Sequence, residues 1–203
     1  MTKLLSTEQM AEFANSGCLF FEGLIDEDIN KEFLNDIGHT DIDDVDNIQH
    51  YFQNIKSSSS IPRIPAGTAL KDAYPLNSPL EKIFKNEIVS GAINSLVGSK
   101  TVVDHQFLHL TFPSKYYAKA NQRQMSQVNH QDSTIDPRTT FDIQLFYFPT
   151  AVTKEMGGTR YHPGTHLRIV NEMGIAKYQN IKGQKNIICK AGTIGIFHSG
   201  LWH

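Results

Sequence analysis

The apolar positions in the first half of the chain repeat mostly with helical spacing. This spacing predicts a helix over residues 6–16, with Ser6 and Gln9 as its capping pair and Gly17 at its C-terminal end. It also predicts a second helix that Asp26 caps. A third and longer helix is predicted over residues 78–98, because a serine–proline start precedes Glu81, which is expected to complete a capping box. Between the first two helices, the mostly apolar run CLFFEGLI of residues 18–25 predicts a short buried strand.

Beyond residue 98 the pattern changes to short β-branched and aromatic runs separated by Gly, Pro or Asn. The runs are TVVDHQFLHLTF, FDIQLFYF, GTRYHP, NIICK and GTIGIFHSGLWH. Such runs are typical of an all-β sandwich or barrel. We therefore expect one domain over residues 1–203, with a mostly helical layer at 1–98 and a β core at 99–203. The polar segment 39–77 interrupts the helical layer as a long loop, which is typical of lids and of poorly ordered segments.

Composition narrows the class of protein. The 203 residues are 39% hydrophobic and carry a net charge of -2, so they support one ordinary folded domain. No block of Lys or Arg favours nucleic acid or an anionic membrane as partner. No apolar run approaches the roughly 18 residues of a membrane span, and the start of the chain does not resemble a signal peptide. Two cysteines outside any C-x-x-C pair favour a reducing compartment, and we expect a cytoplasmic protein.

Several common functional motifs are absent from the sequence. There is no phosphate-binding loop, no dinucleotide glycine fingerprint and no G-x-S-x-G elbow. The segment DIDDVDNIQ resembles a calcium loop only loosely, because Val45 stands where a third ligand is needed and no glycine follows. We interpret it as a solvated acidic loop.

The strongest chemical signal is His130-Gln131-Asp132. In an extended segment, residues i and i+2 point to the same face, so one imidazole and one carboxylate can reach the same ion. Two histidines and one carboxylate form the facial triad of non-haem Fe(II) oxygenases, which leaves three positions open. Seven of the nine histidines lie at or after His105, so further imidazole ligands are available. Taken alone, the pair favours a hydrogen-bonded loop over a metal site, because H-x-D often occurs by chance.

Four segments in their order decide between these alternatives. They are LSTEQMAEFANSGCLFFEGLID, NHQD, MGGTRYHPGTHLR and GTIGIFHSGLWH. Together they resemble the phytanoyl-CoA dioxygenase family of Fe(II)/2-oxoglutarate-dependent oxygenases. The resemblance implies a double-stranded β-helix, or jelly-roll, core packed by N-terminal helices, and an enzyme that uses Fe(II), 2-oxoglutarate and O2. It also implies hydroxylation of a small-molecule substrate, with release of succinate and CO2.

The resemblance carries over the iron ligands as His130, Asp132 and His203. His198 competes for the distal position, but the family's ligand ends its strand after an apolar residue, as His203 does after Trp202. His198 and His203 are an odd number of residues apart and so point to opposite faces of a regular strand. The i, i+4 pair His162 and His166 contains Pro-Gly, which argues against a zinc-binding helix, and the resemblance gives both a structural role.

Co-substrate binding is the least complete part of the resemblance. The family places polar groups near 2-oxoglutarate where this chain has Gln106, His109 and Gln144. Its arginine for the distal carboxylate normally follows the distal histidine by about ten residues, and the sequence stops at His203. We therefore expect a C-terminally truncated chain with an incomplete β core, in which Arg160 and Arg168 are the nearest substitutes.

The expected walls or lids of the pocket are residues 39–77 and 114–127. The second segment is mildly basic, through Lys115, Lys119 and Arg123. Two rival functions share this fold: a cupin-like metalloenzyme that does not use 2-oxoglutarate, and a non-catalytic binding module.

Overall fold

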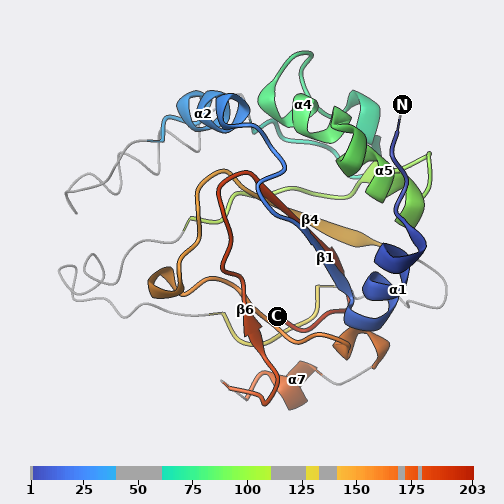
Figure 1. The fold of residues 1–203 in the computed structure, drawn as a ribbon, viewed down its shortest axis with the longest axis vertical. Helices are drawn as coiled ribbons and strands as arrows, with labels where there is room; N and C mark the ends of the chain where they lie inside the picture. The colour runs from blue at the N-terminus through green and yellow to red at the C-terminus, as the bar shows by residue number, and fades with distance from the viewer. Residues whose placement is uncertain (1, 40–60, 111–126, 133–140, 169–171, 178–179) are drawn as a thin grey trace.

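A computed structural model describes residues 2–39, 61–110, 127–132, 141–168, 172–177 and 180–203. Helices α2 (Glu27–Asp36), α4 (Pro79–Lys85) and α5 (Glu87–Leu96) gather at one end of the molecule, and a sheet crosses its middle (Figure 1). Strand β6 (Lys185–Asn186) and helix α7 (Glu172–Ile175) lie at the opposite end. The predictions for residues 41–45, Lys115, Lys119 and Arg123 lie outside the described residues.

The first predicted helix is confirmed, with its capping. Helix α1 spans Thr7–Ser16, and Ser6 forms the expected capping box with Gln9. The helix ends at Gly17, whose φ of 77° is a left-handed conformation that favours glycine. Helix α2 spans Glu27–Asp36. Asp26 stands at its N-cap as expected but makes no side-chain capping bond.

The prediction of a single helix over residues 78–98 is wrong in one respect, because this segment forms two helices. Helix α4 spans Pro79–Lys85 and helix α5 spans Glu87–Leu96. Asn86 breaks them apart with an extended backbone, and its side chain accepts hydrogen bonds from the first backbone N–H groups of α5. The capping box at the start of α4 is also incomplete, since the Glu81 carboxylate accepts from the Asn77 N–H.

The main sheet has three antiparallel strands in the order β1-β7-β4. They are β1 Cys18–Phe21, β7 Thr193–His198 and β4 Ile143–Phe148. Two-stranded pairs join β2 Thr68–Ala69 with β3 Val102–Val103, and β5 Arg160–Tyr161 with β6 Lys185–Asn186. The short helices are the 3₁₀ turns Leu70–Asp72, Lys154–Met156 and Thr165–Leu167, together with α7 Glu172–Ile175.

The described part of the chain contains both helices and strands, with helices beside the sheet as expected. The run that starts at residue 101 forms only β3, and no strand is assigned over residues 104–110. A complete double-stranded β-helix is not seen directly among the described residues, because their main sheet has only the three strands.

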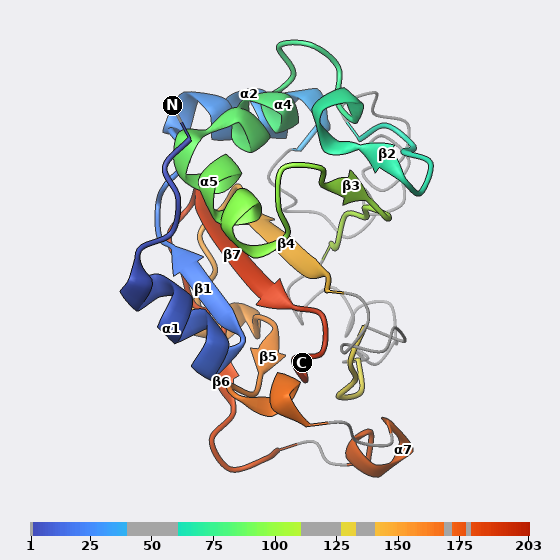
Figure 2. The same ribbon diagram turned by 90° about the vertical axis from the view of Figure 1, so that its right-hand side faces the viewer.

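The central strand β7 of the main sheet is buried on both faces, and the alternation of side chains along the strands decides which of them reach the site. On β7, Ile194 and Ile196 face a core shared with the helices, while Phe197 faces a second core with Tyr161 and Leu201. Adjacent strands repeat this alternation. Figure 2 shows β7 between β1 and β4, with the C-terminal residues leading from β7 toward the segment 127–132.

Candidate metal centre

Backbone pairing brings the H-x-D segment against the end of the chain. The N–H of His130 donates to the carbonyl of His203 at 3.0 Å, and the N–H of His203 donates to the carbonyl of His130 at 3.1 Å. Two residues further on, the Asp132 N–H donates to the Ser199 carbonyl at 3.2 Å. This short ladder continues from β7, so the sheet fixes where the two segments meet (Figure 2).

The three expected ligand side chains converge at this ladder. Nε2 of His130 lies 3.3 Å from Oδ1 of Asp132, and Nε2 of His203 lies 3.2 Å from Oδ2. One candidate ligand atom from each residue lies within 4.8 Å of the others. Two imidazole nitrogens and one carboxylate oxygen are the donor set of the facial triad, so the residues present fit a divalent iron ion.

Each histidine is held by a second hydrogen bond on its other ring nitrogen. Nδ1 of His130 lies 2.8 Å from the Val128 carbonyl, and Nδ1 of His203 lies 2.9 Å from the Leu201 carbonyl. Because a carbonyl only accepts, each Nδ1 carries a proton, which leaves Nε2 of each ring to meet either Asp132 or a metal ion. The carbonyls thus hold both rings with Nε2 directed toward Asp132.

The Asp132 carboxyl is held in its ionised form. Burial alone would raise its pKa, but hydrogen bonds from the two histidines and from Gln144 outweigh this and hold the pKa well below its usual range. Gln144 donates from Nε2 to Oδ2 of Asp132. The carboxylate is therefore available as a ligand at neutral pH.

His198 lies outside this group. Its Nδ1 accepts from the Gly200 N–H at 2.9 Å, and its ring packs 5.1 Å from His166 and from Phe141. Burial lowers the pKa of His166 and of His198, which favours their neutral forms. The geometry therefore favours His203 over His198 as the distal ligand.

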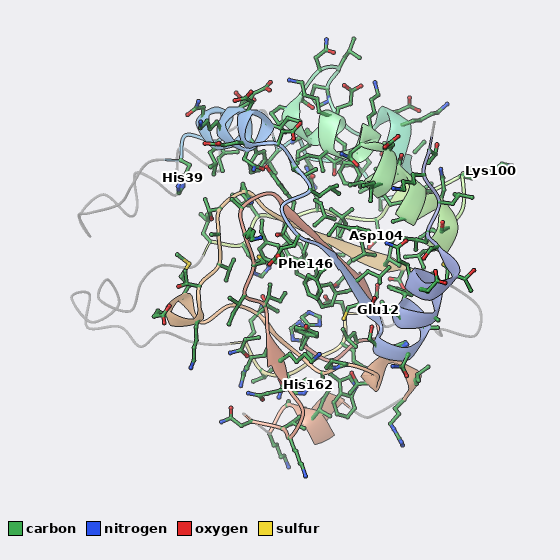
Figure 3. All side chains as sticks on the ribbon, in the orientation of Figure 1. Glu12, His39, Lys100, Asp104, Phe146 and His162 are labelled. Carbon is green, nitrogen blue, oxygen red and sulfur yellow. The ribbon has the colours of Figure 1, made fainter. Side chains whose placement is uncertain are left out.

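The histidines of the H-P-G-T-H segment make structural contacts. His162 is 4% exposed, and its backbone N–H donates to the Trp202 carbonyl at 2.9 Å. His166 donates from Nε2 to the Ala14 carbonyl at the end of α1. In Figure 3, Phe146 is labelled near the centre of the view and His162 below it, and the Phe146 ring centroid is 6.4 Å from that of His203.

The three polar residues expected near the co-substrate have different surroundings. Gln144 contacts the triad, as described above. The Gln106 side chain accepts from the Tyr74 hydroxyl at 3.0 Å and donates to the Pro62 carbonyl, and the His109 ring packs 4.6 Å from that of Phe107. Among the contacts of the described residues, none that we find links Gln106 or His109 to the triad.

Two positions inside the N-H-Q-D motif escaped the sequence analysis. Asn129 is 2% exposed, and its Oδ1 lies 3.4 Å from Nε2 of His162. Gln131 donates from Nε2 to the Gly200 carbonyl at 2.6 Å and, at 3.4 Å, to that of Arg168. Both tie the segment to the loops that surround it. Their polar character beside the H-x-D residues was the only signal in the sequence.

Comparison with known proteins agrees with this geometry. Residues 13–203 match the sequence model of the family described as Phytanoyl-CoA dioxygenase (PhyH), so the chain belongs to the phytanoyl-CoA dioxygenase family. No curated protein matches the sequence significantly.

Solved structures show the same fold at low identity. The "non-heme alpha ketoglutarate dependent carbocyclase SnoK from nogalamycin biosynthesis" is 14% identical, with a TM-score of 0.56 over 100% of this chain and 79% of that one. HygX from Streptomyces hygroscopicus is similar in its apo form, with 12% identity and a TM-score of 0.55. Its form "with nickel and 2-oxoglutarate bound" gives 14% identity and a TM-score of 0.53. Each HygX comparison covers 98% of this chain and 80% of the other.

None of the helices in the described part of the chain is long and apolar enough to cross a membrane.

Proposed function

We propose that this protein is an Fe(II)/2-oxoglutarate-dependent dioxygenase that hydroxylates a small molecule. The observation that carries the proposal is the convergence of His130, Asp132 and His203, whose candidate ligand atoms lie within 4.8 Å of one another. Membership of the phytanoyl-CoA dioxygenase family supports it. Further support comes from HygX, a structure of the same fold that binds nickel and 2-oxoglutarate.

In this proposal the protein supplies geometry and electrostatics. His130 and His203 keep their protons on Nδ1, bonded to backbone carbonyls, so that both Nε2 lone pairs face the metal position. Asp132 stays ionised between them and balances part of the metal charge. Bound iron would use 2-oxoglutarate and O2 to convert a substrate C–H bond to C–OH, giving succinate and CO2.

Asp132 also favours one reaction type. Halogenases related to this family leave the carboxylate position empty for chloride, whereas here a carboxylate fills it. Asp132 therefore favours hydroxylation or a related oxidation, such as desaturation or ring closure, over halogenation. We also propose that residues 1–203 form a single oxygenase domain with a double-stranded β-helix core, which the fold likeness to SnoK and HygX supports. The free cysteines Cys18 and Cys189 support a cytoplasmic location.

Anaerobic titration tests the proposal. Protein mixed with Fe(II) is expected to develop a visible absorption band only after 2-oxoglutarate is added. The band should disappear in His130→Ala and persist in His105→Ala, which removes an exposed histidine that is paired with Asp104. Iron binding without a band would favour the cupin-like enzyme that does not use 2-oxoglutarate. Failure of the protein to bind iron would favour a non-catalytic module.

A further inference from the structure

Gln144 lies on the face of the sheet that points toward the triad. On β4 it pairs with Phe197 of β7, and Phe146, two residues on, contacts the ring of Phe197 at a centroid distance of 4.8 Å. The alternate residues Ile143, Leu145 and Tyr147 pack instead against the helical core. The strand therefore projects Gln144 from a hydrogen-bonded backbone, and not from a loop.

The carboxamide of Gln144 is divided between two environments. Its Nε2 donates to Oδ2 of Asp132, the same oxygen that faces Nε2 of His203 at 3.2 Å. Its Oε1 is buried and has no hydrogen-bond partner among the described residues. The amide orientation follows from the chemistry, because the reverse orientation would place two acceptors against each other.

We infer that Gln144 is a positioning residue: its N–H group fixes the rotation of the Asp132 carboxylate and so sets the affinity of the metal centre. The inference rests on the proposed metal site and differs from the expectation that Gln144 touches the co-substrate. Hydrogen bonds to ligating carboxylates are a common means of orienting metal ligands, and their loss typically weakens metal binding about 10- to 100-fold.

The unpartnered Oε1 supports the same assignment. A buried acceptor is stabilised by a donor such as a water or a hydroxyl group. 2-Oxoglutarate is a dianion at neutral pH and offers no hydrogen-bond donor, so Oε1 would repel its carboxylates. Gln144 is therefore suited to hold Asp132 and is poorly suited to bind the co-substrate.

Co(II) titration followed by visible absorption tests the inference. The variant Gln144→Met keeps the length of the side chain but removes both polar ends. We expect it to bind Co(II) about 10- to 100-fold more weakly than the wild type. The ligand-field bands should shift, and the affinity of the metal-loaded protein for 2-oxoglutarate should stay within a few-fold.

The matched control is Gln9→Met, which removes a glutamine from the capping box of α1, far from the triad in sequence. It should lower the thermal midpoint slightly and leave Co(II) affinity unchanged. If Gln144→Met does not fold by circular dichroism, Gln144→Asn makes the same comparison, because its shorter amide no longer reaches Asp132.

The outcomes separate the two proposals. A wild-type protein that binds no Co(II) contradicts the proposed function itself. A wild-type protein that binds Co(II), with an unchanged affinity and spectrum in the Gln144 variant, overturns only the positioning role. Weakened 2-oxoglutarate binding with normal Co(II) binding also overturns it, and restores Gln144 as a co-substrate contact.

Discussion

Replacing Phe197 by leucine should destabilise the sheet that supports the metal centre. Phe197 is 2% exposed on the central strand β7. Its ring makes three edge-on or steeply tilted contacts, with Phe20 at 5.4 Å, Phe146 at 4.8 Å and Tyr161 at 5.5 Å. Leucine keeps most of the apolar area but loses these contacts.

The magnitude follows from those contacts. Each aromatic pair contributes about 0.5–1.5 kcal/mol beyond the burial of its area. Loss of three pairs, partly offset by repacking, should lower the free energy of unfolding by about 2–3 kcal/mol. That is below the roughly 3–5 kcal/mol typical of Phe→Ala in a core. For a chain of this size, it corresponds to a fall in Tm of about 4–12 °C.

The assay is urea unfolding followed by circular dichroism, with Phe20→Leu as the matched control. Phe20 lies on the neighbouring strand β1, is 37% exposed and takes part in two ring pairs among the described residues, so its replacement should cost about 1 kcal/mol. Metal affinity should change little in either variant, because backbone hydrogen bonds hold His203 to His130. Equal costs for the two variants would refute the reasoning from ring contacts.

Two further predictions concern stability. Burial lowers the pKa of His162, His166 and His198, so the folded state binds fewer protons than the unfolded chain, whose histidines titrate near pH 6.5. These three histidines contribute fully to the stability of the fold above that pH, and the contribution is lost as the pH falls below it. The urea midpoint of the metal-free protein should therefore be lower at pH 5.5 than at pH 7.5. An equal or higher midpoint at pH 5.5 would contradict this. Gly91→Ala, which normally stabilises a helix interior by about 1 kcal/mol, should here lower Tm, because the new Cβ would lie 1.8 Å from the Lys3 carbonyl oxygen. A raised Tm would show that the N-terminal segment does not pack there.

Sequence reasoning succeeded where the signal is local. The capping box of Ser6 with Gln9, the glycine that ends α1 and the strands at β1, β4 and β7 all depend on neighbouring residues. It failed at Asn86, because the apolar repeat continues through this residue although α4 ends before it. The Asn86 side chain does not extend α4 but caps the start of α5. Apolar periodicity does not record that competition.

In the candidate site, too, the sequence predicted local features and did not predict contacts between distant residues. The H-x-D motif specifies two side chains, and only the resemblance could supply His203, because the pairing of His130 with the end of the chain is a long-range contact. The role of Gln144 depends on which oxygen its amide meets across the sheet, and spacing along the strand carries no information about that. The double-stranded β-helix remains a prediction beyond the three strands of the described sheet.

Anaerobic calorimetry with Fe(II) tests the central claim most directly, with the wild type, His203→Ala and His198→Ala compared. We expect the wild type to bind one equivalent of iron. His203→Ala should weaken binding at least about 100-fold, because it removes a ligand and not only an outer contact. His198→Ala should bind iron as the wild type does. Normal binding in His203→Ala, with binding lost in His198→Ala, would contradict the ligand set on which the account depends.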